Sequence, residues 1–128
     1  MSDSQTSPAP LPQPICDSSA LAERGKAALF RVRWFGQDSP AFVLRIDGQP
    51  KAYLNKSAHV PTEMDWQPGE FLDSSGQYIL CSIHGAAYEP STGHCVAGPC
   101  QRGRLVPVPV QEQGGQVEWL PNDDFSPL

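Results

Sequence analysis

Apolar and polar side chains alternate with a period of two along several short stretches of the chain, which is typical of half-buried β-strands. The clearest stretches span residues 30–34 and 42–46. Their predicted buried faces are Phe30, Val32 and Trp34, with Arg31 and Arg33 opposite, and Phe42, Leu44 and Ile46, with Arg45 opposite. A third such face is formed by Val106, Val108 and Val110, and the intervening Pro107 and Pro109 place that strand at a sheet edge.

Turn signals separate these strands at short intervals. They are Asp47-Gly48 before a strand at 51–54, Ser75-Gly76 before Tyr78–Ser82, Thr92-Gly93 inside the segment from Tyr88 to Val96, and Gly114-Gly115 before a last strand with Val117 and Trp119. One short helix is predicted over Ser18–Arg24, capped by Asp17 and ended by Gly25. This pattern predicts a compact antiparallel β-sandwich or small barrel.

The chain length and composition predict one globular domain. The sequence has 128 residues, of which 39% are hydrophobic, as expected for a single core. The proline-rich segment 1–14 is predicted to be a disordered tail, which leaves 15–128 as the domain. The net charge of −5 argues against a nucleic-acid surface and is compatible with docking on a basic protein partner.

The ends and apolar runs of the chain predict a cytoplasmic protein without a membrane partner. No apolar run approaches the roughly 18–20 residues of a membrane-spanning helix. The first residues carry neither the basic start nor the apolar stretch of a secretory signal. In a reducing compartment, cysteines are more often free thiols or metal ligands than disulfides.

The most informative chemistry lies in the segment Cys81-Ser82-Ile83-His84-Gly85. A thiolate and an imidazole three residues apart, at the tip of a strand, can face one metal site. Gly85 allows close approach of the backbone, so that amide N–H groups can point at bound sulfur or an anion. The segment therefore predicts a metal site, although a C-x-x-H spacing alone is a weak signal.

The surrounding segments strengthen the prediction of a metal site, because the run from Tyr53 to Leu105 resembles the Rieske iron–sulfur family. The C-x-x-H-G loop is Cys81–Gly85, the covering loop is Gly98-Pro99-Cys100, and the upstream loop falls at Asn55–Val60. The phrases EMDWQPGEFLD (Glu63–Asp73) and HGAAYEPSTGHCVAGPC (His84–Cys100) resemble a bacterial subgroup of Rieske ferredoxin-like proteins. The resemblance covers most of the chain after about Leu29.

The resemblance implies an all-β, Rieske-type antiparallel sandwich with a small cluster-binding subdomain at about 53–105. It further implies a [2Fe–2S] cluster and one-electron transfer between a reductase and an oxygenase-type partner. The chain would then be an electron carrier and not itself an enzyme, because it is too short to hold a catalytic domain as well.

The ligand set departs from the family pattern at one position. In Rieske centres two histidines hold one iron and two cysteines hold the other. By resemblance, His59 and His84 would hold the outer iron and Cys81 the inner iron, but the first cysteine is replaced by Ser57. A serine hydroxyl is harder and far less acidic than a thiol.

Ser57 leaves two readings open. In one, a cluster is held with serine or with a replacement ligand. In the other, Ser57 is an ordinary loop residue in a cluster-free accessory or binding subunit, as in the small subunits of assimilatory nitrite reductases, which keep this fold without the cluster.

The remaining cysteines and histidine have simpler interpretations. Cys95 and Cys100 are either two buried thiols or a small disulfide, and Cys16 is a small buried apolar residue. His94 is expected to be exposed in the turn at 91–94. A zinc site is a further alternative, although its spacing matches no common zinc finger; its ligands would be Cys81, His84, Cys95 and Cys100.

Overall fold

The chain folds almost entirely into short antiparallel strands. The computed structural model describes residues 11–55, 69–80, 86–98 and 103–128. The elements are β1 (Gln13–Asp17), the 3-10 turn η2 (Ser18–Ala20), β2 (Ala28–Trp34), β3 (Gln37–Ile46), β4 (Gln49–Leu54), β5 (Ile79–Leu80), β6 (Ala87–Tyr88), β7 (Cys95–Ala97), β8 (Pro107–Val108), β9 (Val110–Gln113), β10 (Gln116–Trp119) and β11 (Phe125–Ser126). The predicted all-β class is confirmed.

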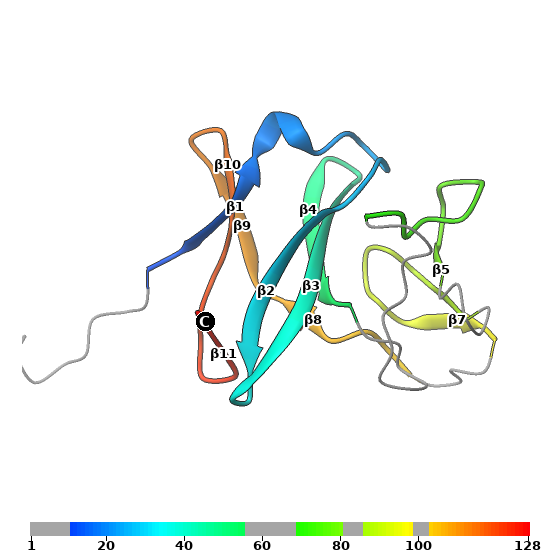
Figure 1. Ribbon diagram of the computed structural model, residues 1–128. Coiled ribbons are helices and arrows are strands. Elements are labelled where there is room, and N and C mark those ends of the chain that lie inside the picture. The colour runs from blue at the N-terminus through cyan, green and yellow to red at the C-terminus, as the bar shows by residue number, and fades with distance from the viewer. Residues whose placement is uncertain (1–10, 56–68, 81–85, 99–102) are drawn as a thin grey trace, which may run out of the picture.

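Three antiparallel sheets stand side by side. A central five-stranded sheet has the order β11-β2-β3-β4-β8, flanked by β1-β10-β9 and by a small sheet, β5-β6-β7. Figure 1 shows the five-stranded sheet between the other two, with β1, β9 and β10 on one side and β5 and β7 on the other. The small sheet falls within the segment predicted as the cluster-binding subdomain.

The central strand β3 is buried on both faces, because each face covers a separate hydrophobic cluster. The even-numbered residues Phe42, Leu44 and Ile46 of β3 belong to the first cluster. Its other buried members are Ala27, Tyr53, Phe71, Ile79, Ala86, Tyr88 and Leu105. The odd-numbered residues Ala41 and Val43 of β3 belong to the second cluster. Its other buried members are Leu21, Val32, Ala52, Leu54, Val108, Val117, Trp119 and Phe125. The predicted apolar face of Phe42, Leu44 and Ile46 is confirmed, but the expectation of a half-buried strand is wrong at Val43, which is 0% exposed.

The predicted hairpin turns are confirmed by their backbone angles. Asp47 and Gly48 have φ of 54° and 80°, and Gly114 and Gly115 have 60° and 78°. Two successive residues at positive φ are typical of the type I′ turn, whose twist matches that of the flanking strands. These turns fix the register of β3 against β4 and of β9 against β10.

The predicted helix over Ser18–Arg24 is wrong beyond its first three residues. Leu21 is extended and buried, and the Asp17 carboxylate accepts a hydrogen bond from Gln116 Nε2 at 2.6 Å instead of capping a helix. The Arg45 guanidinium donates to the carbonyl oxygens of Ser18 at 3.1 Å and Leu21 at 2.8 Å. The Ser18 carbonyl also accepts from the Leu21 N–H at 3.2 Å, which closes the single 3-10 turn, and the Arg45 side chain satisfies the Leu21 carbonyl where a helix would continue.

Two predicted boundaries also change. β1 begins at Gln13, so the last residues of the predicted tail 1–14 pair with β10, while 1–10 lie outside the described residues. The valine strand at 106–110 is split at Pro109 into β8 and β9, which belong to different sheets. Its three valines all lie in or against the second cluster, and β8 is an edge strand, as the prolines predicted.

Candidate metal centre

The small sheet brings the starts of one predicted ligand loop and of the predicted covering loop to the same end. Leu80 pairs with Ala87, and Ala87 pairs with Ala97 in the neighbouring strand. The predicted ligand loop 81–85 connects β5 to β6 at this end, and β7 reaches the same end before Gly98. The predicted ligand loop and the predicted covering loop therefore start from adjacent strand ends.

Most of the predicted site residues lie outside the described residues. They are Ser57 and His59 in 56–68, Cys81, His84 and Gly85 in 81–85, and Pro99 and Cys100 in 99–102. Gly98 is described: it is exposed and has φ of 91°, a left-handed conformation that favours glycine. The ligand set from the sequence stays a prediction.

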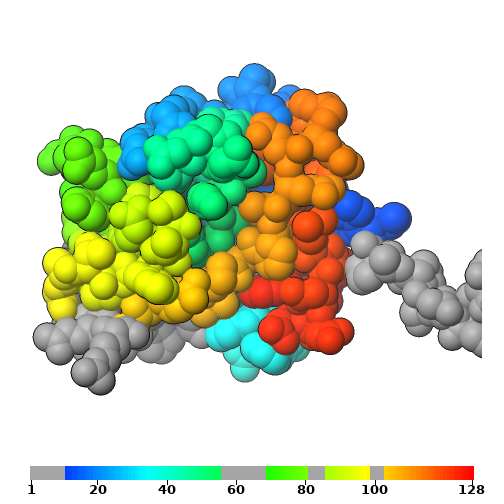
Figure 2. Space-filling model, turned by 180° about the vertical axis from the view of Figure 1, so that it is seen from behind, coloured from blue at the N-terminus to red at the C-terminus, as the bar shows by residue number. Residues whose placement is uncertain are grey.

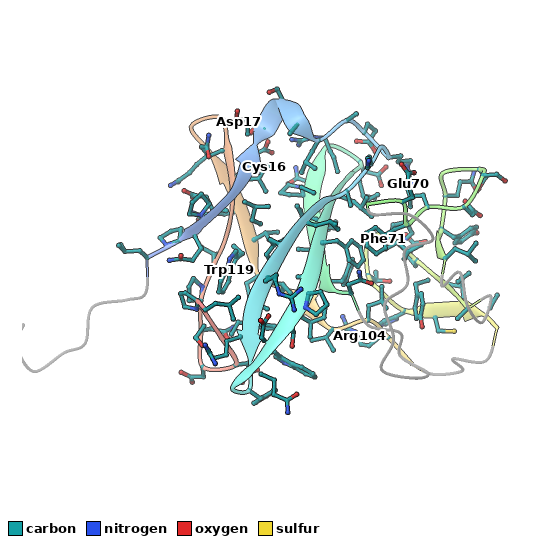
Figure 3. The ribbon with its side chains drawn as sticks, in the orientation of Figure 1. Cys16, Asp17, Glu70, Phe71, Arg104 and Trp119 are labelled. Atoms are coloured by element: carbon teal, nitrogen blue, oxygen red, sulfur yellow. The ribbon has the colours of Figure 1, made fainter. Side chains whose placement is uncertain are left out.

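The first hydrophobic cluster holds the small sheet against the central one. Phe71 stacks on Phe42 of β3, with ring centroids 3.7 Å apart and planes 14° apart. Figure 3 shows Phe71 on the side of the central sheet that faces the small sheet, with Trp119 on the opposite side. The Leu80 N–H donates to the Phe71 carbonyl at 2.8 Å, so this buried aromatic pair is tied directly to the last residue of β5.

Tyr53 makes a second link between the two sheets. Its ring lies in the first cluster, and its hydroxyl donates to the buried Pro90 carbonyl oxygen at 2.8 Å. Burial raises the pKa of the Tyr53 phenol to about 12. The roles of Tyr53 and Phe71 were not predicted from the sequence. For Tyr53, the available signal was an aromatic residue two positions before the upstream loop.

Asn55 marks the point where β4 leads into segment 56–68. It is 5% exposed, and its N–H donates to the Pro40 carbonyl at 2.8 Å. The Leu54 N–H donates to the Val106 carbonyl at 2.9 Å, which places the start of this segment beside the chain that returns from 99–102. On the far side of segment 56–68, the Gly69 carbonyl accepts from the Ala27 N–H at 2.9 Å.

The described cysteines differ from one another in redox state. Cys95 is half-buried and disulfide-bonded, so the alternative of two free thiols is wrong for this residue, while a pairing with Cys100 stays a prediction. A disulfide sulfur is not a thiolate, which removes Cys95 as a ligand in the zinc alternative. Cys16 is a half-buried free thiol against the second cluster, and burial raises its pKa.

The part of the chain that the structure describes was considered for metal-binding side chains and for membrane-spanning helices. No group of three or more histidine, cysteine, aspartate or glutamate side chains gathers there in a way that could hold a metal ion. None of its helices has the length and apolar character needed to cross a membrane. His94 is exposed after its turn, as predicted.

The described residues form an all-β chain of three antiparallel sheets. The Rieske [2Fe-2S] domain profile matches residues 12–120. The chain therefore belongs to the Rieske [2Fe–2S] domain family. Comparison with curated proteins gives no match.

Solved Rieske structures share this fold. The ferredoxin of carbazole 1,9a-dioxygenase from Nocardioides aromaticivorans IC177 has a TM-score of 0.69 and 20% identity, over 88% of this chain and 100% of that one. The terminal oxygenase from Novosphingobium sp. KA1 has a TM-score of 0.67 and 23% identity, over 91% of this chain but 31% of that one. This chain thus resembles a whole ferredoxin and one part of an oxygenase.

A third similar structure is a complex of reduced oxygenase and oxidised ferredoxin in carbazole 1,9a-dioxygenase. It has a TM-score of 0.64 and 23% identity, over 85% of this chain and 92% of that one. At identities of this size, the similarity supports the fold.

The fit of a [2Fe–2S] cluster rests on the strand register and on the donor set. The register brings the segments that hold Cys81, His84 and Gly98 to one sheet end. Three donors, His59, His84 and Cys81, are of the types that a Rieske cluster requires, and Ser57 is not. By residue type, the sequence therefore fits the cluster at three of the four predicted ligand positions.

Proposed function

We propose that the chain is a Rieske-type electron carrier that holds a [2Fe–2S] cluster and exchanges one electron with a protein partner. His59 and His84 would hold one iron, and Cys81 would hold the other together with Ser57 or a replacement ligand. When bound, the cluster supplies reversible one-electron redox chemistry. The observation that carries this proposal is the pairing of Leu80 with Ala87 and of Ala87 with Ala97, which brings the ligand loop and the covering loop to one end.

The chain's own contribution would be to position these loops rigidly. The stacked Phe42 and Phe71, the fully buried Tyr88 and the Tyr53–Pro90 hydrogen bond fix the small sheet to the central one. Gly85, Gly98, Pro99 and Cys100 would cover the cluster, with backbone N–H groups available to its sulfurs. A rigid frame keeps the ligands in place when the charge changes, which favours fast electron transfer.

The proposed partner is a reductase or oxygenase protein. Two comparisons support it: a similar structure is a complex of an oxygenase with a ferredoxin, and the match to another ferredoxin covers all of that chain. The net charge of −5 would steer it toward a basic protein surface and away from nucleic acid. In this reading the chain is a carrier and the catalytic step belongs to the partner.

A second function is favoured by one specific observation, the serine at position 57. Without a second thiolate, the inner iron would lose its soft ligand, and the domain could serve as a cluster-free accessory or binding subunit. The fold would tolerate this loss, because the two hydrophobic clusters bury their side chains without any metal.

Anaerobic purification from iron-supplemented cells separates the two functions. The carrier function predicts a coloured protein with iron and acid-labile sulfide in equal amounts, reduced by one electron per cluster. Cys81→Ala should abolish the colour, and His94→Ala, which alters an exposed histidine outside the ligand set, should leave it unchanged. A colourless, folded protein without iron would overturn the carrier proposal in favour of the accessory subunit.

A further inference from the structure

A cleft lies where the small sheet meets the edge of the central sheet, and we call it the junction pocket. Its volume is about 500 Å³. Its walls come from β4, from the turn after β6, and from β8 and the start of β9. The lining residues are Pro50, Lys51, Ala52, Tyr53, Ser91, Thr92, His94, Arg104, Pro107, Val108 and Val110. Figure 2 shows the blue-green of β4, the yellow-green of the turn and the orange of β8 and β9 meeting on this face.

The charges that line the junction pocket are all of one kind. Lys51 and Arg104 are its charged residues, with the imidazole of His94 beside them, and among the described residues no carboxylate lines it, although the chain has 14 acidic residues against nine lysines and arginines. The nearest acidic residue along the turn, Glu89, directs its carboxylate to Ser91, at 3.2 Å from N and 2.8 Å from Oγ. Ser91 lines the pocket, so this carboxylate lies beside it, and the two cations outnumber the one adjacent negative charge.

The two cations have no carboxylate partner among the described residues. By contrast, Arg24, Arg31 and Arg45 are each paired with a carboxylate elsewhere on the surface. The Arg104 guanidinium donates to the Thr92 carbonyl at 3.2 Å, which uses one N–H of Nη2 and leaves further donors to face the cleft. An anion in the cleft would supply the missing partner.

The turn that forms one wall is held in place before any ligand arrives. The Gly93 N–H donates to the Glu89 carbonyl at 2.7 Å, and the Leu105 N–H donates to the Gly93 carbonyl at 2.8 Å. A Cβ at Gly93 would lie 2.8 Å from Tyr53 Cε1, so the turn packs directly on the Tyr53 ring. A preformed wall reduces the ordering cost of binding.

The other wall is apolar and does not suit an added peptide strand. Tyr53 and Val108 are each 3% exposed, and they form the pocket floor with Val110. β8 is an edge strand of two residues, and its Pro107 offers no N–H to a neighbouring strand. The cleft volume falls in the range of about 300–1,000 Å³ that is usual for small-molecule sites.

We propose that the junction pocket binds a small organic oxyanion. The carboxylate or phosphate of the ligand lies between Lys51 and Arg104, with His94 and the Thr92 hydroxyl as further donors, and its apolar part covers Tyr53 and Val108. This site uses none of the predicted cluster ligands, so it is independent of whether the protein carries a cluster. It would allow an anionic metabolite to bind on the same domain as the redox centre.

Three probes and the full-length chain test this proposal by calorimetry and amide NMR. Benzoate carries a carboxylate and an apolar ring, benzamide is its uncharged counterpart, and inorganic phosphate has the charge without the ring. We expect benzoate to bind best, with shifts at residues 51–53, 91–94, 104 and 108. Benzamide should bind about tenfold more weakly or worse, because it lacks the charge-assisted hydrogen bonds.

Matched substitutions localise the site. Lys51→Gln and Arg104→Gln should each weaken benzoate binding about tenfold, whereas Arg33→Gln, which removes an exposed cation of β2 outside the pocket, should leave it unchanged. Thermal unfolding of each variant shows whether it is folded, and the two pocket variants are independent of each other. The proposal is overturned if benzoate does not bind, if benzamide or phosphate binds as tightly, or if neither pocket variant weakens binding.

Discussion

The Tyr53 hydroxyl on β4 donates a hydrogen bond of 2.8 Å to the carbonyl oxygen of Pro90, which follows β6 in the small sheet. The two residues are 37 positions apart, and both are buried. This bond, together with the stacking of Phe42 on Phe71, connects the central sheet to the frame of the candidate metal centre. These contacts hold the strands β4 and β5, from which two of the predicted ligand loops start.

Tyr53→Phe should lower the free energy of unfolding by about 1–3 kcal/mol, because the Pro90 carbonyl would be left buried without a partner. The hydroxyl also gives a pH signature. Its folded pKa of about 12 exceeds the value near 10 for an unfolded chain, so its contribution is complete below about pH 10 and is lost as the pH rises toward 12. The free energies of unfolding of the unchanged protein and of Tyr53→Phe, measured with denaturant, should converge as the pH rises from about 10 to 12. A difference that stays constant over this range would contradict the stabilising role of the Tyr53 hydroxyl.

Gly93→Ala should cost more stability than Gly36→Ala. Both glycines have nearly the same backbone angle, with φ of 80° at Gly93 and 81° at Gly36. A Cβ at Gly36 meets open space, whereas one at Gly93 would lie 2.8 Å from Tyr53 Cε1. The shared conformational cost is about 1–2 kcal/mol, and the overpacking at Gly93 should add about 1–3 kcal/mol.

Urea melts of the two variants measure this difference directly. Equal losses of stability would show that the turn can move away from Tyr53. In that case, the wall of the junction pocket would not be preformed.

Glu112→Gln should remove part of the acid sensitivity of the fold. The Arg45 guanidinium contacts both carboxylate oxygens, at 3.0 Å and 2.7 Å, and this hydrogen bonding lowers the pKa of Glu112 to about 2. A depressed folded pKa means that the stabilisation is present above about pH 4.5 and is lost as the pH falls toward 2.

The variant should therefore melt at a lower temperature at neutral pH and lose less stability between pH 4.5 and 2. Glu118→Gln is the control, because the Glu118 carboxylate accepts from the neutral amide of Gln111 and pairs with no cation among the described residues. A steep acid loss that persists in Glu112→Gln would show that other carboxylates dominate in this range.

The strands were predictable where one local rule decides the structure. Alternation gave the buried face of Phe42, Leu44 and Ile46, and the pair Asp47-Gly48 gave the turn that follows. Alternation could not show that Val43 is buried as well, because a second sheet covers its face only in the folded chain.

The errors in the fold arise from long-range contacts. The helix predicted at Ser18 fails because Arg45, far along the chain, binds the carbonyls that a helix would use. Strand β1 was not predicted, because Pro14 and the prolines before it indicated an extended tail, and it is defined by pairing with β10. The donor types of the candidate centre could be identified from the sequence, but Ser57, His59, Cys81 and His84 all lie outside the described residues.

The central claim, that this fold holds a Rieske-type cluster at the four predicted positions, is tested most directly by Ser57→Cys. We expect this variant, expressed with iron, to contain about two irons per chain and, when reduced, to show an electron paramagnetic resonance spectrum of mixed histidine–cysteine ligation. The unchanged protein should hold less iron or lose it more readily to a chelator. If Ser57→Cys gains neither iron nor this spectrum over the unchanged protein, position 57 is not a ligand position and the claim is wrong.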